Sequence, residues 1–299
     1  MSLARDHALA LSAAFGAFAL WGLAPIYFKL LDAVSAHEII AHRIVWSVFF
    51  LGGVLALRHG SKLGERLHVS RRTLGALAIS GTLIAVNWLI FVFAINSDRV
   101  LSTSLGYFIN PLVTVVLGLI IFREKLVPVQ TLAVLIAAAG TLYLTLRVGQ
   151  FPWIALGLAG SFALYSLVRK LTDVGPMVGL FWETILMMPF AVIWLVLLGH
   201  QEQLVFSPTN WGLAALLIGT GLVTVVPLLL FATGVRRLPL STVGIMQYLA
   251  PSITFMLAVF VYAEPFTLDH AITFGCIWLS LALFSWAGWT RMRRARIPV

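Results

Sequence analysis

Two ionisable residues, Arg43 and Glu183, stand inside long apolar stretches of the sequence. If such a stretch lies in lipid, a charge within it costs about 2.5–3.5 kcal/mol on insertion scales and usually faces a cavity or a polar partner. The Arg43 side chain is long enough to reach the interface from its depth, which is the simpler alternative for that residue. The Glu183 carboxylate is too short to do so and is expected to face water or a hydrogen-bond donor.

Polar and aromatic residues at similar depth predict two clusters around these charges. The cluster expected near Arg43 contains Asn87, Tyr107 and Asn110, and the one near Glu183 contains Tyr165, Gln247 and Tyr248. Four tryptophans that lie well within apolar stretches are consistent with a pocket for amphipathic or aromatic ligands: Trp21, Trp46, Trp88 and Trp182. Hydrogen bonds that only hold helices together, core packing and lipid contact are the alternatives for each residue.

Motifs for enzymatic chemistry are missing from the sequence or have the wrong spacing. There is no Gly-Lys pair, hence no phosphate-binding loop, and the single cysteine, Cys276, excludes a disulfide framework and a cysteine-based metal site. His37 and His42 are five residues apart and so sit about 140° apart on a helix, whereas two zinc ligands need a spacing of four. Glu38 is instead expected in the first turn of a helix, where it complements the dipole. The sequence predicts no metal and no cofactor.

The elements that must position these residues are membrane-spanning helices. Of 299 residues, 61% are hydrophobic and 10% charged, against roughly half and a quarter in soluble domains. Ten apolar stretches are long enough to cross a bilayer, at 8–31, 38–57, 73–95, 101–121, 128–146, 152–170, 177–198, 210–233, 240–262 and 269–289. Because backbone groups in lipid must be satisfied internally, the expected fold is an all-α membrane protein with ten transmembrane helices, nine or eleven being the alternatives. No connection leaves room for a soluble catalytic domain.

The distribution of basic residues predicts the orientation. With a cytoplasmic N-terminus, sixteen lysines and arginines fall on the cytoplasmic side and three, Lys29, Arg99 and Arg147, on the other. Both termini are therefore expected in the cytoplasm. The net charge of +9 is explained as an orientation signal, so no nucleic-acid partner is expected.

The two halves of the chain align with an offset of 140 residues. LSTSLGYFINPLVTVVLGLIIFREKL (101–126) matches LSTVGIMQYLAPSITFMLAVFVYAEPF (240–266), so that Pro111 meets Pro251 and Glu124 meets Glu264. Five helices in each half make the second half enter the membrane from the opposite side, which is the inverted repeat of many transporters. We expect repeats at 1–147 and 148–299, with Pro111 and Pro251 bending their helices around a cavity. Chance alignment of apolar helices is the alternative.

Several segments resemble the RarD permeases, in the EamA branch of the drug/metabolite transporter superfamily. They are FALWGLAPIYFKLL (18–31), HEIIAHRIVWSVFF (37–50), NWLIFVFAIN (87–96), SLGYFINPL (104–112), LGLAGSFALYSLVRK (156–170) and VPLLLFATGVRRLPLSTVGIMQYLAP (226–251). The resemblance runs from about residue 10 to 290. It implies a bacterial-type inner-membrane permease of two inverted five-helix halves, whose relatives export amino acids and other small metabolites.

The hypothesis favoured by these features is a secondary permease that moves a small organic metabolite outward by rocking two halves around a central site. Its expected partners are a small-molecule substrate and the lipid bilayer, with no nucleotide. An intramembrane enzyme and a membrane scaffold are the alternatives, and they lack a catalytic constellation and an appended domain, respectively. The scarcity of buried carboxylates argues against sodium coupling and leaves Glu183, with His42 in reserve, for protons. The oligomeric state stays open, a monomer being one alternative.

Overall fold

The computed structural model describes residues 2–121, 127–148, 151–207, 209–235 and 246–295, and the regular secondary structure in these ranges is helical. The first half contains α1 (Ser2–Lys29), α2 (Ala36–His59), α4 (Arg71–Asn96), α5 (Val100–Ile121) and α6 (Pro128–Val148). A 3-10 turn (Gly60–Lys62) and the short α3 (Leu63–Leu67) lie between α2 and α4. The second half contains α7 (Trp153–Leu171), α8 (Pro176–His200), α9 (Trp211–Val235), α11 (Leu249–Met256), continued by a π-helical turn (Leu257–Val261), and α12 (Leu268–Ala295).

The expectation of an all-α membrane protein is confirmed. Nine of the ten apolar stretches each fall on one helix, and the described part of the ninth, 240–262, contains α11 and the π-helical turn. By length and composition, six helices of the described chain can cross a membrane: α1, α2, α4, α8, α9 and α12. Shorter apolar helices cover Pro128–Leu144, Trp153–Arg169 and Leu249–Val261.

Side chains with local hydrogen-bonding capacity fix where several helices begin. Ser35 caps α2, with its hydroxyl accepting a bond from the N–H of Glu38 at 3.2 Å, and Ser70 caps α4 in the same way through Thr73 at 3.1 Å. Pro176 opens α8, where its missing N–H has no intrahelical partner to lose. Glu38 lies in the first turn of α2, as predicted.

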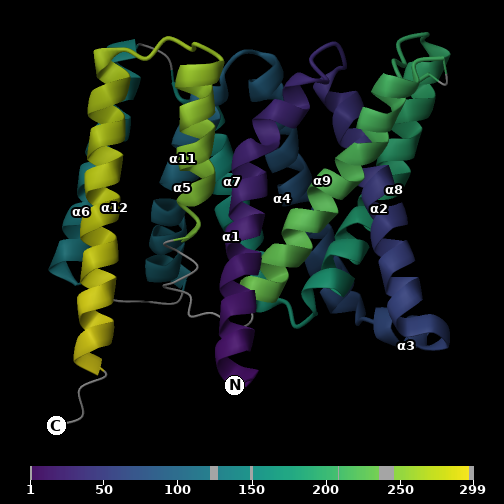
Figure 1. The fold of residues 1–299 in the computed structure, drawn as a ribbon, viewed down its shortest axis with the longest axis horizontal. Helices are drawn as coiled ribbons and strands as arrows, with labels where there is room; N and C mark the ends of the chain where they lie inside the picture. Colours follow the sequence, from purple (N-terminus) through teal and green to yellow (C-terminus); the bar gives the residue numbers. More distant parts are fainter. Residues whose placement is uncertain (1, 122–126, 149–150, 208, 236–245, 296–299) are drawn as a thin grey trace.

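The described helices run alternately up and down, so that the described connections lie at two ends of the bundle (Figure 1). The first residues of α1 and the last residues of α12 lie on the same side of the bundle as α3, and we call this side the terminal face. The connection between α2 and α4, rich in basic residues, also lies on the terminal face. The connections that follow α1, α4, α8 and the π-helical turn lie on the other side, the opposite face.

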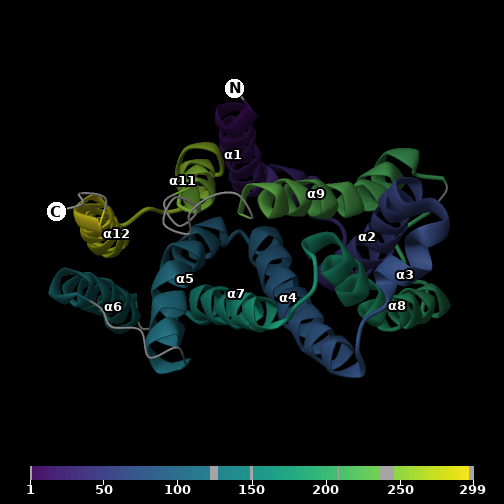
Figure 2. The ribbon, with the colours of Figure 1, turned by 90° about the horizontal axis from the view of Figure 1, so that it is seen from below.

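Seen along the helices, the bundle consists of two layers (Figure 2). Layer one contains α12, α11, α1, α9 and α2 in that order, and layer two contains α6, α5, α7, α4 and α8. Each layer therefore takes helices from both halves of the sequence. Contacts between helices show the same symmetry. In layer one α1 contacts α9 and α11, and in layer two the corresponding α7 contacts α4 and α5. The pairs α2–α8 and α6–α12 join the layers at their two ends. This is the arrangement that an inverted repeat produces.

Two glycines at matching positions allow helices within each layer to approach closely. A Cβ on Gly81 of α4 would lie 3.1 Å from the backbone oxygen of Glu183 on α8. A Cβ on Gly221 of α9, which is 140 residues later, would lie 2.7 Å from the backbone carbonyl carbon of Trp46 on α2. Only a residue without a side chain fits these contacts, and they bring the helices that carry Glu183 and Arg43 against their neighbours.

Candidate functional site

Arg43 lies inside the bundle and is only 6% exposed. Its Nε donates a hydrogen bond to the hydroxyl of Thr224 on α9 at 2.6 Å, and that hydroxyl donates in turn to the carbonyl of Thr220. The guanidinium carbon lies 4.2 Å from the ring centroid of Trp88 on α4 and 5.3 Å from that of Phe28 on α1. The side chain is thus directed into the bundle instead of extending to the interface.

Aromatic rings offset part of the cost of burying this charge. A desolvated cation over an aromatic face gains about 2 kcal/mol, which is comparable to the insertion cost of an arginine in a helix. Trp88, one of the four tryptophans expected to line a pocket, lies over Arg43 in this way. Tyr107 of the predicted cluster is half-buried on α5, and its ring lies 5.9 Å from that of Phe91 on α4. Asn110, three residues further along α5, is buried.

Glu183 is buried in layer two and is 1% exposed. Its Oε1 accepts a hydrogen bond from Ser80 of α4 at 2.6 Å and lies 3.5 Å from Nε of Arg169 on α7. Its Oε2 accepts a longer bond of 3.4 Å from the Tyr165 hydroxyl. The expectation of a nearby donor is met, and the carboxylate has both donors and a positive charge around it.

Two other predicted residues bind backbone groups. The amide of Asn87 donates to the carbonyl of Leu158 at 2.9 Å and to the hydroxyl of Ser161 at 3.0 Å, which joins α4 to α7. The indole of Trp182 donates to the carbonyl of Leu67 at 2.9 Å, at the end of α3. Both contacts join helices to neighbouring segments.

The remaining predicted residues lie elsewhere. Trp21 packs in an aromatic group with Phe18 and Phe231. Tyr248, directly before α11, stacks on Phe108 with centroids 6.4 Å apart, and Gln247 beside it is half-buried. Tyr248 thus meets α5, whereas the described partners of Glu183 are Ser80, Tyr165 and Arg169.

The prolines of the repeat occupy different settings. Pro251 lies in the first turn of α11 (Leu249–Met256). Its carbonyl accepts a hydrogen bond of 2.8 Å from the hydroxyl of Ser104 on α5. The backbone of α5 stays helical through Pro111. Glu124, which the alignment pairs with Glu264, lies outside the described residues.

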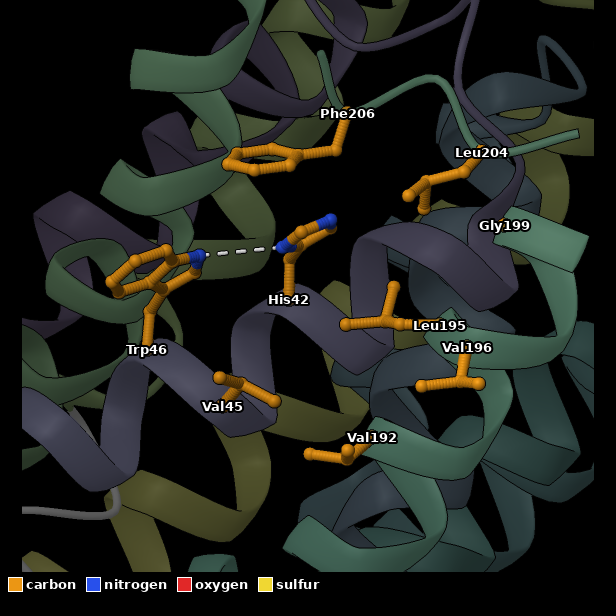
Figure 3. Close-up of a pocket in the computed structure, with 9 residues that line it drawn as sticks. All are labelled: His42, Val45, Trp46, Val192, Leu195, Val196, Gly199, Leu204 and Phe206. Atoms are coloured by element: carbon orange, nitrogen blue, oxygen red, sulfur yellow. Dashed lines mark hydrogen bonds between the residues drawn. The ribbon is translucent and has the colours of Figure 1, made fainter. Parts of the chain in front are cut away.

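A groove of about 390 Å³ lies between α2 and α8 near the opposite face (Figure 3). His42 projects into it, accepting at Nδ1 a hydrogen bond of 3.3 Å from the indole of Trp46, while the ring of Phe206 lies 4.7 Å away. The other lining residues are apolar or glycine: Val45, Val192, Leu195, Val196, Gly199 and Leu204. Val192 and Val196 are exposed on the outside of the bundle, so the groove opens toward the region that lipid occupies.

Two glutamates that were not predicted as site residues tie segments together near the opposite face. Glu38 accepts hydrogen bonds from the N–H groups of Val205 and Phe206, both at 3.0 Å, in the connection between α8 and α9. Glu264 accepts bonds from the N–H groups of Val100 and Leu101 at the start of α5, at 2.6 and 2.8 Å. The N-terminus of α5 is thereby capped by a carboxylate from layer one.

Cross-layer contacts continue beside this cap. Lys29 at the end of α1 forms an ion pair with Asp98 in the connection between α4 and α5, and it lies 5.5 Å from the ring of Tyr262. The opposite face is thus closed between α1, α5 and the connection before α12. In the part of the chain that the structure describes, no group of three or more His, Cys, Asp or Glu residues could hold a metal ion.

Sequence reasoning missed Ser80, Thr224 and Arg169 as partners of the buried charges. Arg169 follows Tyr165 by four residues and so shares its helix face, a signal that could have placed it beside Glu183. The two hydroxyls carry no comparable signal, because many threonines and serines in membrane helices bond only to their own backbone.

Comparison with known proteins identifies relatives over nearly the whole chain. The model of the EamA-like transporter family matches twice, at residues 8–146 and 152–290. The uncharacterized transporter YojE of Bacillus subtilis is 43% identical over 273 residues, covering 90% of this chain and 91% of that protein. Protein RarD of Escherichia coli is 42% identical over 271 residues, covering 91% and 92%. A crystal structure with 18% identity covers 93% of this chain and 97% of its own, with a TM-score of 0.62, and supports the fold.

Proposed function

The chain belongs to the EamA-like transporter family and is a membrane permease, and we propose that it moves small organic metabolites by alternating access. We propose further that it exports amino acids or related amphipathic compounds. The family match and the names of the relatives support the transport function, and the substrate class is our own addition.

The observation that supports alternating access is that each layer combines helices from both halves of the sequence (Figure 2). The two layers have the same helix packing, but one is inverted relative to the other. A conformation that is closed on one face of the bundle therefore has a counterpart that is closed on the other face. The moving bodies in this proposal are the layers, which mix both halves of the sequence, instead of the two halves themselves. Arg43 contacts Trp88 across the boundary between the layers.

In the described structure the opposite face is closed by polar contacts across that boundary. Lys29 pairs with Asp98, and Glu264 caps α5. An ion pair near the surface is worth about 0–1 kcal/mol, which is small enough to break and re-form in each cycle. We propose that opening of this face separates Lys29 from Asp98 and the Glu264 carboxylate from α5.

The placement in the cell follows from the basic residues. We propose that the terminal face is cytoplasmic, that the membrane is a bacterial-type inner membrane, and that residues 1–147 and 148–299 form the two repeats. We propose that the partners of the protein are a small-molecule substrate and the bilayer, and that it uses no nucleotide or nucleic acid. A single chain contains both layers, so a monomer is sufficient for the proposed movement.

Cysteine cross-linking tests alternating access. In a chain with Cys276→Ser, Lys29→Cys and Asp98→Cys are joined by an oxidant in proteoliposomes, and uptake is compared before and after reduction. We expect transport to stop on oxidation and to recover on reduction, because the opposite face can no longer open. Each single cysteine should transport equally well before and after oxidation, because it cannot form the cross-link. Full transport by the cross-linked 29–98 protein would contradict the proposal.

A further inference from the structure

We propose that Arg43 is the receptor for the anionic group of the transported molecule, and that this molecule is a monocarboxylate with an apolar or aromatic portion. The inference rests on the proposed transport function and adds to it the chemical class of the ligand and the residue that recognises it. Three observations support it: the donors of Arg43 that remain for a ligand, the pairing of the nearby glutamates with other groups, and a second buried polar side chain on α2.

The guanidinium of Arg43 is bound on its faces and on one edge. Trp88 and Phe28 lie over it at 4.2 and 5.3 Å, and Nε donates to Thr224. A guanidinium carries five N–H donors in one plane, so the four on the two terminal nitrogens remain. Among the described residues, Thr224 is the one hydrogen-bond acceptor that the structure gives Arg43. The four remaining N–H groups form the fork that binds a carboxylate through two parallel hydrogen bonds.

The acids of the described chain that could neutralise Arg43 are engaged elsewhere. Within these residues no carboxylate lies within 4 Å of the guanidinium. Glu38, on the same helix, is held by the N–H groups of Val205 and Phe206. Glu183 is bound by Ser80 and paired with Arg169 in layer two. A buried cation without a counter-ion is an energetic cost, and a ligand that brings a single negative charge removes it.

Ser47 supplies an independent observation. Its hydroxyl is fully buried and has no hydrogen-bond partner in the part of the chain that the structure describes. Ser47 lies one turn after Arg43 on α2, so both side chains share a face of the helix. An unsatisfied buried hydroxyl beside an unneutralised guanidinium indicates that both groups meet a polar ligand at some stage of the cycle. Trp88 and Phe28 provide the apolar surface for the remainder of that ligand.

Matched acid and amide pairs test the receptor by binding alone. The full chain in detergent is heated with 3-phenylpropanoate or 3-phenylpropanamide, and with L-phenylalanine or L-phenylalaninamide, and the shift of its unfolding temperature is recorded. We expect the acids to stabilise the wild-type protein and the amides to have little effect. In Arg43→Gln the affinity for the acids should fall about 10- to 100-fold, which is the size of a lost charge-assisted hydrogen-bond pair.

Two further variants keep the result interpretable. Arg43→Lys retains the charge without the fork and should lie between wild type and Arg43→Gln, and it serves as the test if Arg43→Gln does not fold. Arg58→Gln, which removes an exposed arginine from the end of the same helix, should bind like wild type. Equal stabilisation by acids and amides, no stabilisation by either acid, or unchanged binding in both Arg43 variants would overturn the receptor. Binding through Arg43 without uptake into vesicles would instead contradict the proposed transport function.

Discussion

The carboxylate of Glu183 lies 3.5 Å from Nε of Arg169, so the buried acid of α8 is paired with a base of the adjacent helix. Arg43, which stands at the matching position of the repeat on α2, has no carboxylate within the same reach among the described residues. The two layers therefore share their packing but differ in chemistry. One layer carries a balanced ion pair and the other an unbalanced cation, and we assign ligand recognition to the latter.

The first prediction concerns Glu183→Gln, which keeps the volume and an acceptor for Ser80 but removes the charge. Glu183 is a deeply buried carboxylate whose charge is balanced by Arg169. A cycle that separates the two would favour protonation of the buried carboxyl, so we expect Glu183 to couple transport to protons. The variant should lose accumulation driven by a pH gradient in proteoliposomes and should retain counterflow exchange. Glu202→Gln, in an exposed connection, is the control. If wild type and Glu183→Gln behave alike in both modes, the residue is structural and not part of the coupling.

The second prediction concerns the close approach of α9 to α2. Gly221→Ala places a Cβ 2.7 Å from the Trp46 backbone, so the helices must separate, and we expect a loss of about 1–3 kcal/mol in unfolding free energy. Gly75→Ala adds the same methyl group where nothing lies within 4 Å. It should leave stability unchanged or raise it by up to about 1 kcal/mol. Reversible denaturant unfolding in detergent measures both, and equal effects would show that the contact is not tight.

The third prediction is a pH dependence at Glu264. Burial raises the pKa of this carboxyl above its ordinary value of 4.5, although the N–H groups of Leu101 and Val100 and the charge of Lys29 act in the other direction, and Asp98 adds to the rise. The folded chain thus holds this proton more tightly than the unfolded chain. The resulting stability is fully present below pH 4.5 and is lost as the pH rises through the raised pKa.

Thermal unfolding in detergent between about pH 4 and pH 7 checks this dependence by difference. The wild-type unfolding temperature should fall relative to that of Glu264→Gln as the pH increases, because the variant has no carboxyl to ionise. Gln retains one carbonyl oxygen for the start of α5. A constant difference across the range, or a difference of the other sign, would show that Glu264 does not titrate in this way.

The fourth prediction is the topology. In a chain with Cys276→Ser, a cysteine at position 61, between α2 and α4, should react with a membrane-impermeant thiol reagent only from the cytoplasm. A cysteine at position 203, between α8 and α9, should react only from outside, since these connections lie on different faces (Figure 1). Reaction of both from the same side would contradict the bundle and the inversion together.

The sequence predicts well where a residue lies along its helix, but it predicts poorly which residues of other helices that residue contacts. Apolar length indicates where each helix crosses, so it places Tyr165 at the depth of Glu183. It leaves open whether Arg43 extends to the interface, and the structure shows that Arg43 is buried. Helix order and rotation depend on packing between helices that are distant in sequence. Tyr248 was therefore expected near Glu183 but stacks on Phe108 of α5. The charge of Arg169 contributes to the orientation signal, and only its spacing of four residues from Tyr165 indicates a position beside Glu183.

Transport itself is the central claim, and uptake into proteoliposomes tests it most directly. Vesicles containing the purified protein are incubated with a mixed pool of amino acids and other small metabolites, and their contents are identified by mass spectrometry against protein-free vesicles. We predict selective uptake of one or a few carboxylate-bearing compounds, reduced in Arg43→Gln and unchanged in Arg58→Gln. Uptake no better than that of protein-free vesicles for every compound in the pool would contradict the account.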